Sequence, residues 1–219
     1  MPNLGISQLI EIAILLVVLL FSIIIHEVAH GYVALRNGDP TARMLGRLTL
    51  NPVPHIDPIG TVLVPLILLL PYFIYGHFPS ILFGWARPVP VNPLNFRNHK
   101  WGEITVSAAG PLSNLMLAVA FAVLFRLAGS NQGLLYLANI GVSLNIILAL
   151  FNLIPIPPLD GSHILARVLP RDLALTYQRR AADSAPDHAL REGQYLPPCR
   201  PISPDSEAFP ATAQGTRLA

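Results

Sequence analysis

The sequence predicts an all-α integral membrane protein, a helical bundle of about four to five transmembrane segments with short extended or re-entrant loops. Hydrophobic residues make up 53% of the 219 residues, charged residues only 12%, and the mean hydropathy is +0.53. A soluble domain of this size carries about twice that charged fraction. The charges are also sparse up to about residue 170. The apolar part of the chain is therefore expected to lie in a membrane.

Four apolar segments are expected to form the main spans, and they comprise residues 6–25, 60–75, 104–128 and 133–154. The first is long enough to cross about 30 Å of hydrocarbon, and its helix should continue to Arg36. The second is marginal in length and contains two prolines, which predicts a kinked or tilted span. A helical fragment after Gly161 is expected to enter the membrane only partly.

The chain divides at about residue 177. Residues 1–177 are predicted to form the transmembrane domain, whereas residues 178–219 are polar, rich in proline and without apolar periodicity, which predicts a disordered tail. A net charge of +2 with no basic cluster argues against a nucleic-acid partner. The single cysteine, Cys199, excludes an internal disulfide and argues against a cysteine-based zinc site. No Lys or Arg precedes the first apolar run, so we expect that span to be retained rather than cleaved as a signal peptide.

Positive charges leave the orientation open. The loop at residues 36–58 carries three arginines, and the loop at residues 76–100 carries two arginines and one lysine. If every span crosses, these loops lie on opposite sides of the membrane, and the positive-inside rule gives nearly a tie.

The first span ends in the motif His26-Glu27-Val28-Ala29-His30, which is HExxH. Residues i and i+4 share one helix face about 5–6 Å apart, so both imidazoles can reach one metal ion. Glu27 lies about 100° round the helix, where it can contact a metal-bound water without being a ligand. Zinc would lower the pKa of that water towards about 7, and the carboxylate could then take its proton. The alternative is chance, or histidines hydrogen-bonded within a bundle, but unpaired polar groups at that depth would be costly.

Catalytic zinc needs a third protein ligand and an open fourth position. Asp160 is the best candidate, because it follows the proline-rich stretch NLIPIPPL, which breaks the fourth span near membrane depth. The alternative is a helix N-cap, since Asp-Gly-Ser before HILARVL is a reasonable helix start. His163, three residues further on, is a second candidate ligand.

Together these stretches resemble the site-2 proteases, which are intramembrane zinc metalloproteases. HEVAH late in an apolar helix and the later NLIPIPPLDGSHIL are similar to the paired motifs of that family. GRLTLNPVPHIDPIGT, GWARPVPVNP and AAGPLSNL resemble its compact bacterial and archaeal branch. The resemblance covers roughly residues 8–176. It implies a multi-pass protein of the plasma (inner) membrane of a prokaryote, with residues 1–177 as a transmembrane metalloprotease domain.

The resemblance also implies an activity and a set of residues. One zinc ion per chain would be bound by His26, His30 and Asp160, with Glu27 as general base. Asn152 would position the substrate or stabilise the oxyanion, a role that suits an amide donor, although an interhelical hydrogen bond is the alternative. The implied reaction is hydrolysis of peptide bonds in or near transmembrane segments of a membrane protein or peptide. The sequence identifies neither that substrate nor the oligomeric state.

Three further groups of residues bear on helix packing and on the surroundings of the site. Asn114 in GPLSN is expected to pack between helices, with Gly110 and Ser113 allowing close approach. The stretch HIDP, which contains His55 and Asp57, is either a loop turn or a contribution to the mouth of the site. The stretch RPVPV should be extended, and we predict that it pairs with an unwound substrate strand by edge addition near Val89.

Two other functions are compatible with the same residues. A membrane metal-binding or transport protein could use the ligands, although Glu27 has no obvious use there. A catalytically inactive scaffold could keep the fold. This branch of the family usually continues after a YQ-like stretch into another hydrophobic helix, whereas Tyr177-Gln178 lead here into a polar segment.

Overall fold

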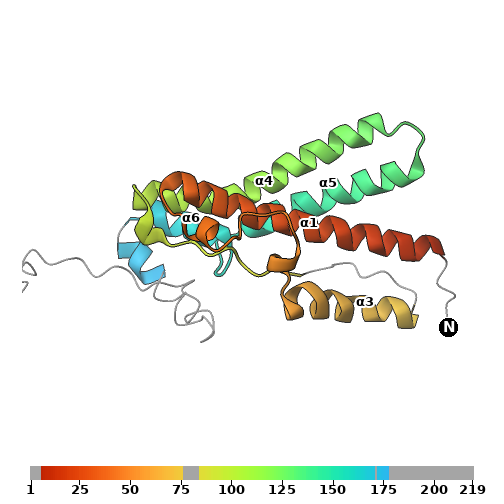
Figure 1. Ribbon diagram of the computed structural model, residues 1–219, viewed down its shortest axis with the longest axis horizontal. Coiled ribbons are helices and arrows are strands. Elements are labelled where there is room, and N and C mark those ends of the chain that lie inside the picture. The colour runs from red at the N-terminus through yellow and green to blue at the C-terminus, as the bar shows by residue number, and fades with distance from the viewer. Residues whose placement is uncertain (1–5, 76–83, 171, 178–219) are drawn as a thin grey trace, which may run out of the picture.

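The computed structural model describes residues 6–75, 84–170 and 172–177, and every regular element in these ranges is helical (Figure 1). The predicted tail, residues 178–219, lies outside the described residues, so its disorder stays a prediction. Three helices are long and apolar enough to cross a membrane: α1 (Ile6–Asn37), α4 (His99–Leu127) and α5 (Gln132–Asn152). The fold class of an all-α membrane protein is confirmed.

Asparagine side chains mark where the second and third long helices begin. Asn98 accepts a hydrogen bond from the Trp101 amide at the start of α4, and Asn131 accepts one from the Leu134 amide at the start of α5. Such caps satisfy amides that have no partner inside the helix. α4 and α5 form a helical hairpin, and the first half of α4 packs against the end of α1 (Figure 1).

The second predicted span is shorter than a crossing helix. It consists of a π-helical turn, η2 (Pro58–Leu63), followed by α3 (Val64–Tyr75), which contains Pro71. The side chain of Asp57 caps η2, accepting hydrogen bonds from the amides of Ile59 and Gly60. The irregular first turn leaves α3 as the regular helix among the described residues of this segment.

After α3 the chain comes back to the position in the bundle where this segment began. The Trp85 amide donates to the Gly60 carbonyl over 3.1 Å, and the Thr61 hydroxyl donates to the Trp85 carbonyl over 2.8 Å. Residues 60 and 85 are therefore neighbours, so the excursion, defined by its described residues 58–75 and 84–85, begins and ends at the same level of the bundle. The expectation that this segment crosses the membrane is wrong, and three candidate crossings remain in the described part of the chain.

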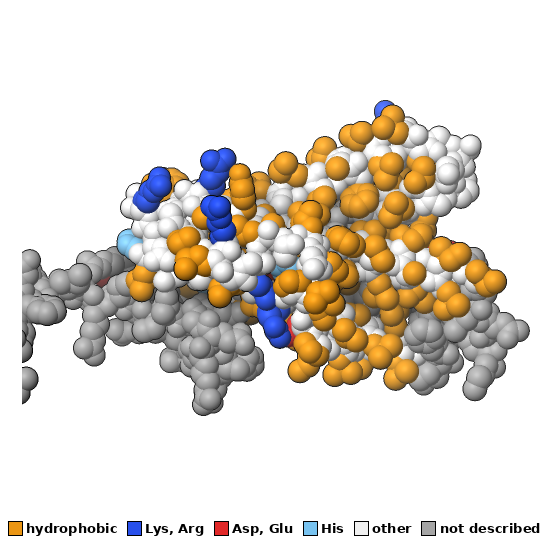
Figure 2. All heavy atoms as spheres, in the orientation of Figure 1, with side chains coloured by type: hydrophobic (Ala, Val, Ile, Leu, Met, Phe, Trp, Pro, Cys, Tyr) orange, Lys and Arg blue, Asp and Glu red, His pale blue; other side chains and the backbone are white. Residues whose placement is uncertain are grey.

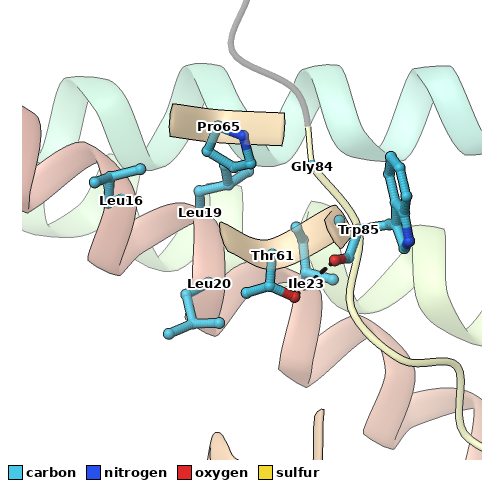
Figure 3. A pocket seen from close by; sticks show the side chains of 9 residues that line it. Leu16, Leu19, Leu20, Ile23, Thr61, Pro65, Gly84 and Trp85 are labelled. Carbon is cyan, nitrogen blue, oxygen red and sulfur yellow. Dashed lines mark hydrogen bonds between the residues drawn. The ribbon is translucent and has the colours of Figure 1, made fainter. Parts of the chain in front are cut away.

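An apolar pocket of about 130 Å³ lies between α1 and the start of this excursion (Figure 3). Its lining comes from one face of α1 and from both ends of the excursion, and consists of Leu16, Leu19, Leu20, Ile23, Gly60, Thr61, Pro65, Gly84 and Trp85. None of the candidate zinc ligands lines it. The excursion therefore faces the first helix through apolar side chains.

The loops on either side of the excursion lie together at one end of the bundle. The Arg97 amide donates to the Asn37 carbonyl over 3.0 Å, and the Arg87 amide donates to the His55 carbonyl over 2.8 Å. The assumption that these loops face opposite sides of the membrane is therefore wrong. Lys and Arg side chains gather over this end in Figure 2, and its two loops and adjoining helix ends contain Arg36, Arg43, Arg47, Arg87, Arg97 and Lys100.

Asp39 joins the two loops. It is fully buried just after α1, and its carboxylate accepts hydrogen bonds from the Asn92 amide (2.7 Å) and the Asn95 side chain (2.8 Å), as well as from Thr41. Burial raises the pKa of Asp39, but the hydrogen bonds from Thr41, Asn95 and the Asn92 amide outweigh burial and hold that pKa below its ordinary value. The loops are thus fixed to each other by a carboxylate that stays ionised.

Candidate metal centre

His26, His30 and Asp160 meet where α1, α4 and α6 (Asp160–Val168) come together. The two Nε2 atoms lie 3.0 Å apart. Asp160 places Oδ2 3.2 Å from Nε2 of His26 and Oδ1 3.3 Å from Nε2 of His30. These three residues form the group in the described part of the chain that could hold a metal ion, and they are the three predicted ligands.

The spacing of the three ligand atoms fits zinc. Two ligands of one tetrahedral zinc ion stand about 3.3–3.6 Å apart, given zinc–ligand distances of about 2.0–2.2 Å. The three spacings of 3.0, 3.2 and 3.3 Å lie at or just below this range. Oδ2 of Asp160 is buried without a hydrogen bond, which is costly unless a cation or another donor satisfies it. Two imidazoles and one carboxylate are also a donor set that zinc prefers.

The fold directs Asp160 inward from the first turn of α6. The N-cap position belongs to Leu159, so the alternative that Asp160 caps the helix is not what the structure shows. Gly161 lies against the backbone carbonyls of Leu153 and Ile154, where a Cβ atom has no room. This close approach explains why glycine follows the aspartate.

A charge pair fastens the other end of α6. The Arg167 guanidinium donates to both carboxylate oxygens of Glu103 on α4, with 2.6 Å between Nε and Oε2. Both side chains are at least partly buried, and a two-point contact of this kind fixes direction as well as distance. The helix that carries the third ligand is therefore held to α4 by this pair.

Each imidazole has a partner on α4 behind its metal-facing nitrogen. Nδ1 of His30 donates to the Val106 carbonyl over 2.7 Å, because a carbonyl can only accept. This hydrogen bond leaves the lone pair of Nε2 free for a metal ion. The orientation of the ring is thus set by the backbone of the neighbouring helix.

Asn114 is the corresponding partner of His26. Its side-chain amide lies 3.3 Å from Nδ1 of His26, it is fully buried, and its Oδ1 has no hydrogen bond. Turning the amide by 180° places Oδ1 against Nδ1, where it accepts the ring proton and frees Nε2 for the metal. The expectation that Asn114 packs between helices is confirmed, and its partner on α1 is the imidazole of His26. The spacing of Gly110 and Asn114, one turn apart on α4, was the signal in the sequence.

Gly110 allows α4 to approach the two imidazoles. A Cβ atom at this position would lie 2.5 Å from Cε1 and 2.6 Å from Nε2 of His26, and it would also collide with His30. The expected close approach at this glycine is confirmed, although its partners are the ligand side chains rather than a helix backbone.

Glu27 lies beside the cluster and is half-buried. Its Oε2 accepts a hydrogen bond from the Val89 amide over 2.8 Å. Val89 itself is 7% exposed, and its side chain fills the space beside Gly31. Its amide is therefore engaged by Glu27, and the described residues contain no strand. The prediction that this extended stretch pairs with a substrate strand therefore stays a prediction, and the Val89 amide is not free to take part in such pairing.

Other candidate residues lie outside the metal cluster. His163 is not part of the group around Asp160. The side chain of Asn152 donates to the Leu148 carbonyl of its own helix over 2.9 Å, so its role toward substrate stays a prediction. His55 is fully buried, donates to the Thr49 carbonyl, and has a pKa that burial lowers, which keeps the ring neutral. Asp57 caps η2, so the HIDP stretch forms a loop turn, which is the first of its two predicted roles.

Replacing Gly110 with alanine should displace both imidazoles, because the added methyl group overlaps them. We expect zinc affinity to fall at least about tenfold, measured by competition with a chromogenic chelator on detergent-purified protein. Gly133→Ala is the matched control, since its Cβ would meet only Oδ1 of Asn131 at 3.5 Å. Equal zinc affinity in the two variants would contradict the packing described above.

Replacing Asn114 with alanine should weaken zinc binding by about 10- to 100-fold, because His26 would lose the partner that sets its tautomer. Asn145→Ala provides the comparison, since Asn145 is equally buried but bonds to Ser22 and Gly141. Both variants should lower the melting temperature, and only Asn114→Ala should lower zinc affinity. A zinc affinity that falls equally in both would show that the loss is a general effect of destabilisation.

Comparisons with known proteins agree with this geometry. The model of the family described as "Peptidase family M50" matches residues 127–183. "Putative zinc metalloprotease YwhC" of Bacillus subtilis is 42% identical over 165 residues, which is 71% of this chain and 69% of that protein. "Putative zinc metalloprotease Rip2" of Mycolicibacterium smegmatis is 31% identical over 144 residues, covering 65% of this chain and 52% of its own length.

A more distant relative carries a similar name. "Zinc metalloprotease MJ0392" of Methanocaldococcus jannaschii is 27% identical over 160 residues and is covered over 34% of its length. No solved structure matches the chain significantly. The extent of the similarity to the Bacillus subtilis protein and the arrangement of His26, His30 and Asp160 lead to the same assignment. The chain belongs to peptidase family M50, the site-2 protease family, and is an intramembrane zinc metalloprotease.

Proposed function

We propose that this protease cleaves peptide bonds in or near transmembrane segments of membrane proteins, with His26, His30 and Asp160 as zinc ligands and Glu27 as general base. The observation that carries this proposal is the convergence of the three ligand atoms on helices of the membrane bundle. A site built between apolar helices is reached most directly by a substrate that is itself in the membrane.

Glu27 and the backbone groups that hold the site have separate roles in the proposed hydrolysis. Bound zinc supplies a Lewis acid that activates water and polarises the scissile carbonyl. Glu27 takes a proton from the attacking water through Oε1, while the Val89 amide holds Oε2. The same carboxylic acid then gives its proton to the amide nitrogen as the carbon–nitrogen bond breaks. The backbone carbonyl of Val106 keeps the proton of His30 on Nδ1 throughout.

Glu27→Gln tests the assignment of the base. We expect the variant to retain one zinc ion per chain and to lose at least about 100-fold in cleavage of a model transmembrane substrate, since an amide cannot accept the water proton. Zinc content is measured by mass spectrometry, and cleavage is measured in detergent or in proteoliposomes. Glu11→Gln, an exposed change on the same helix, should cleave as the wild type does. Full activity of Glu27→Gln would contradict the assignment of Glu27 as general base. Loss of zinc from the variant would indicate instead that Glu27 is a zinc ligand.

We further propose that the end of the bundle bearing the basic residues faces the cytoplasm. Six Lys and Arg residues belong to the loops and helix ends there, whereas Arg126 is the basic residue at the far end of the described bundle. The positive-inside rule counts such residues near the ends of spans, so the bias is large once both loops are on one side. The start of α1 and the turn between α4 and α5 would then face outward.

Thiol labelling tests this orientation. In a Cys199→Ser background, Met44→Cys places a thiol at an exposed position of the basic end, and Ser130→Cys places one in the turn between α4 and α5. A membrane-impermeant maleimide should label Ser130→Cys in intact cells and Met44→Cys only after permeabilisation. The reverse pattern would contradict the proposed orientation.

A further inference from the structure

Arg47, in the loop after α2 (Thr41–Met44), contacts the segment that holds the catalytic glutamate. One terminal nitrogen of its guanidinium lies 2.8 Å from the Arg87 carbonyl and 3.2 Å from the Pro88 carbonyl. Both contacts are donations from a charged group, which are stronger than hydrogen bonds between neutral groups. Arg47 thus donates hydrogen bonds to two successive residues of the extended segment.

The second of these contacts leads directly to Glu27. The Pro88 carbonyl and the Val89 amide belong to the same peptide group, and that amide donates to Oε2 of Glu27 over 2.8 Å. A positive guanidinium, one peptide group and a negative carboxylate therefore form a continuous chain of hydrogen bonds. In such a chain each hydrogen bond polarises and strengthens the next.

We propose that Arg47 is a positioning residue for the general base, acting through the Pro88–Val89 peptide group. It holds that peptide in place and makes its N–H a stronger donor, so that Oε2 is fixed and Oε1 is presented to water. This inference rests on the proposed role of Glu27 and adds a residue to it.

The surrounding residues explain why the segment depends on Arg47. Pro88 and Pro90 carry no N–H, so the Val89 amide is the single backbone donor across these three residues. One terminal nitrogen of Arg47 reaches both carbonyls because the arginine side chain is long and its charged end carries two N–H groups on that nitrogen.

The position of Arg47 also costs folding free energy, because part of its guanidinium is buried without a partner. Its Nε is buried without a hydrogen bond. Burial and the neighbouring Arg87 lower the pKa of Arg47, whereas Glu27 raises it, so the guanidinium and the carboxylate interact electrostatically. Stability alone therefore does not explain this arginine.

Steady-state kinetics on the zinc-loaded full chain test the proposal. Arg47→Gln should lower kcat about tenfold while KM, zinc content and melting temperature stay near the wild-type values, since a weaker hold on the base affects only the chemical step. Arg47→Lys keeps the charge and the N–H donors on a shorter side chain, and should recover part of the loss. Arg43→Gln, an exposed change on the neighbouring helix α2, is the matched control and should leave kcat unchanged.

A second measurement does not depend on activity. Exchange of the Val89 amide, followed by NMR on protein labelled with ¹⁵N-valine, should accelerate in both Glu27→Ala and Arg47→Gln and stay slow in Arg43→Gln. Unchanged kcat or unchanged exchange in Arg47→Gln would overturn the proposal, as would a joint loss of zinc and melting temperature. A zinc-loaded wild type that cleaves no substrate would count against the proposed function, and the exchange measurement would still decide the contact.

Discussion

The rest of the structure depends on the pairing of three polar side chains inside an apolar bundle. His26, His30 and Asp160 would each be costly alone in that environment, and they become acceptable only when they face one another and a cation. Their positions dictate the packing around them. Gly110 gives the imidazoles room against α4, and Gly161 lets α6 begin against a backbone, so that both glycines serve the same meeting point.

The proposed base shares α1 with two of the proposed ligands, but its carboxylate is held by a different part of the chain. The proposed ligands lie on α1 and α6 and pack against α4, whereas the Glu27 carboxylate accepts a hydrogen bond from the extended segment at residues 87–92. That segment is anchored along its length, through the Arg87 amide to His55, through the Val89 amide to Glu27, and through the Asn92 amide to Asp39. Its prolines restrict the backbone before any contact forms, which reduces the entropy lost in ordering it. Metal binding and base positioning can therefore be perturbed separately.

The sequence was sufficient for the features that depend on local spacing. His26 and His30 share a face because they are one helical turn apart, and Asp160 was identifiable as a carboxylate beside a broken span. The spacing of Gly110 and Asn114 was the local signal for the role of Asn114, but it did not identify the partner, which lies 88 residues away. The return of the chain at Trp85 depends on a contact with Gly60, and no local pattern encodes that pairing.

The correction at Trp85 changes the physical setting of the proposed reaction. With both loops at one end, the basic residues and the metal centre share that end, and His30 lies about 9 Å along the helix from Arg36 at a rise of about 1.5 Å per residue. Water therefore has a short path to the site. On the proposed function, the bond to be cut lies near the end of a substrate helix rather than at its centre. The terminal carbonyls of a helix have no partner within it, so a substrate offers its most accessible peptide bonds at the depth where Glu27 lies.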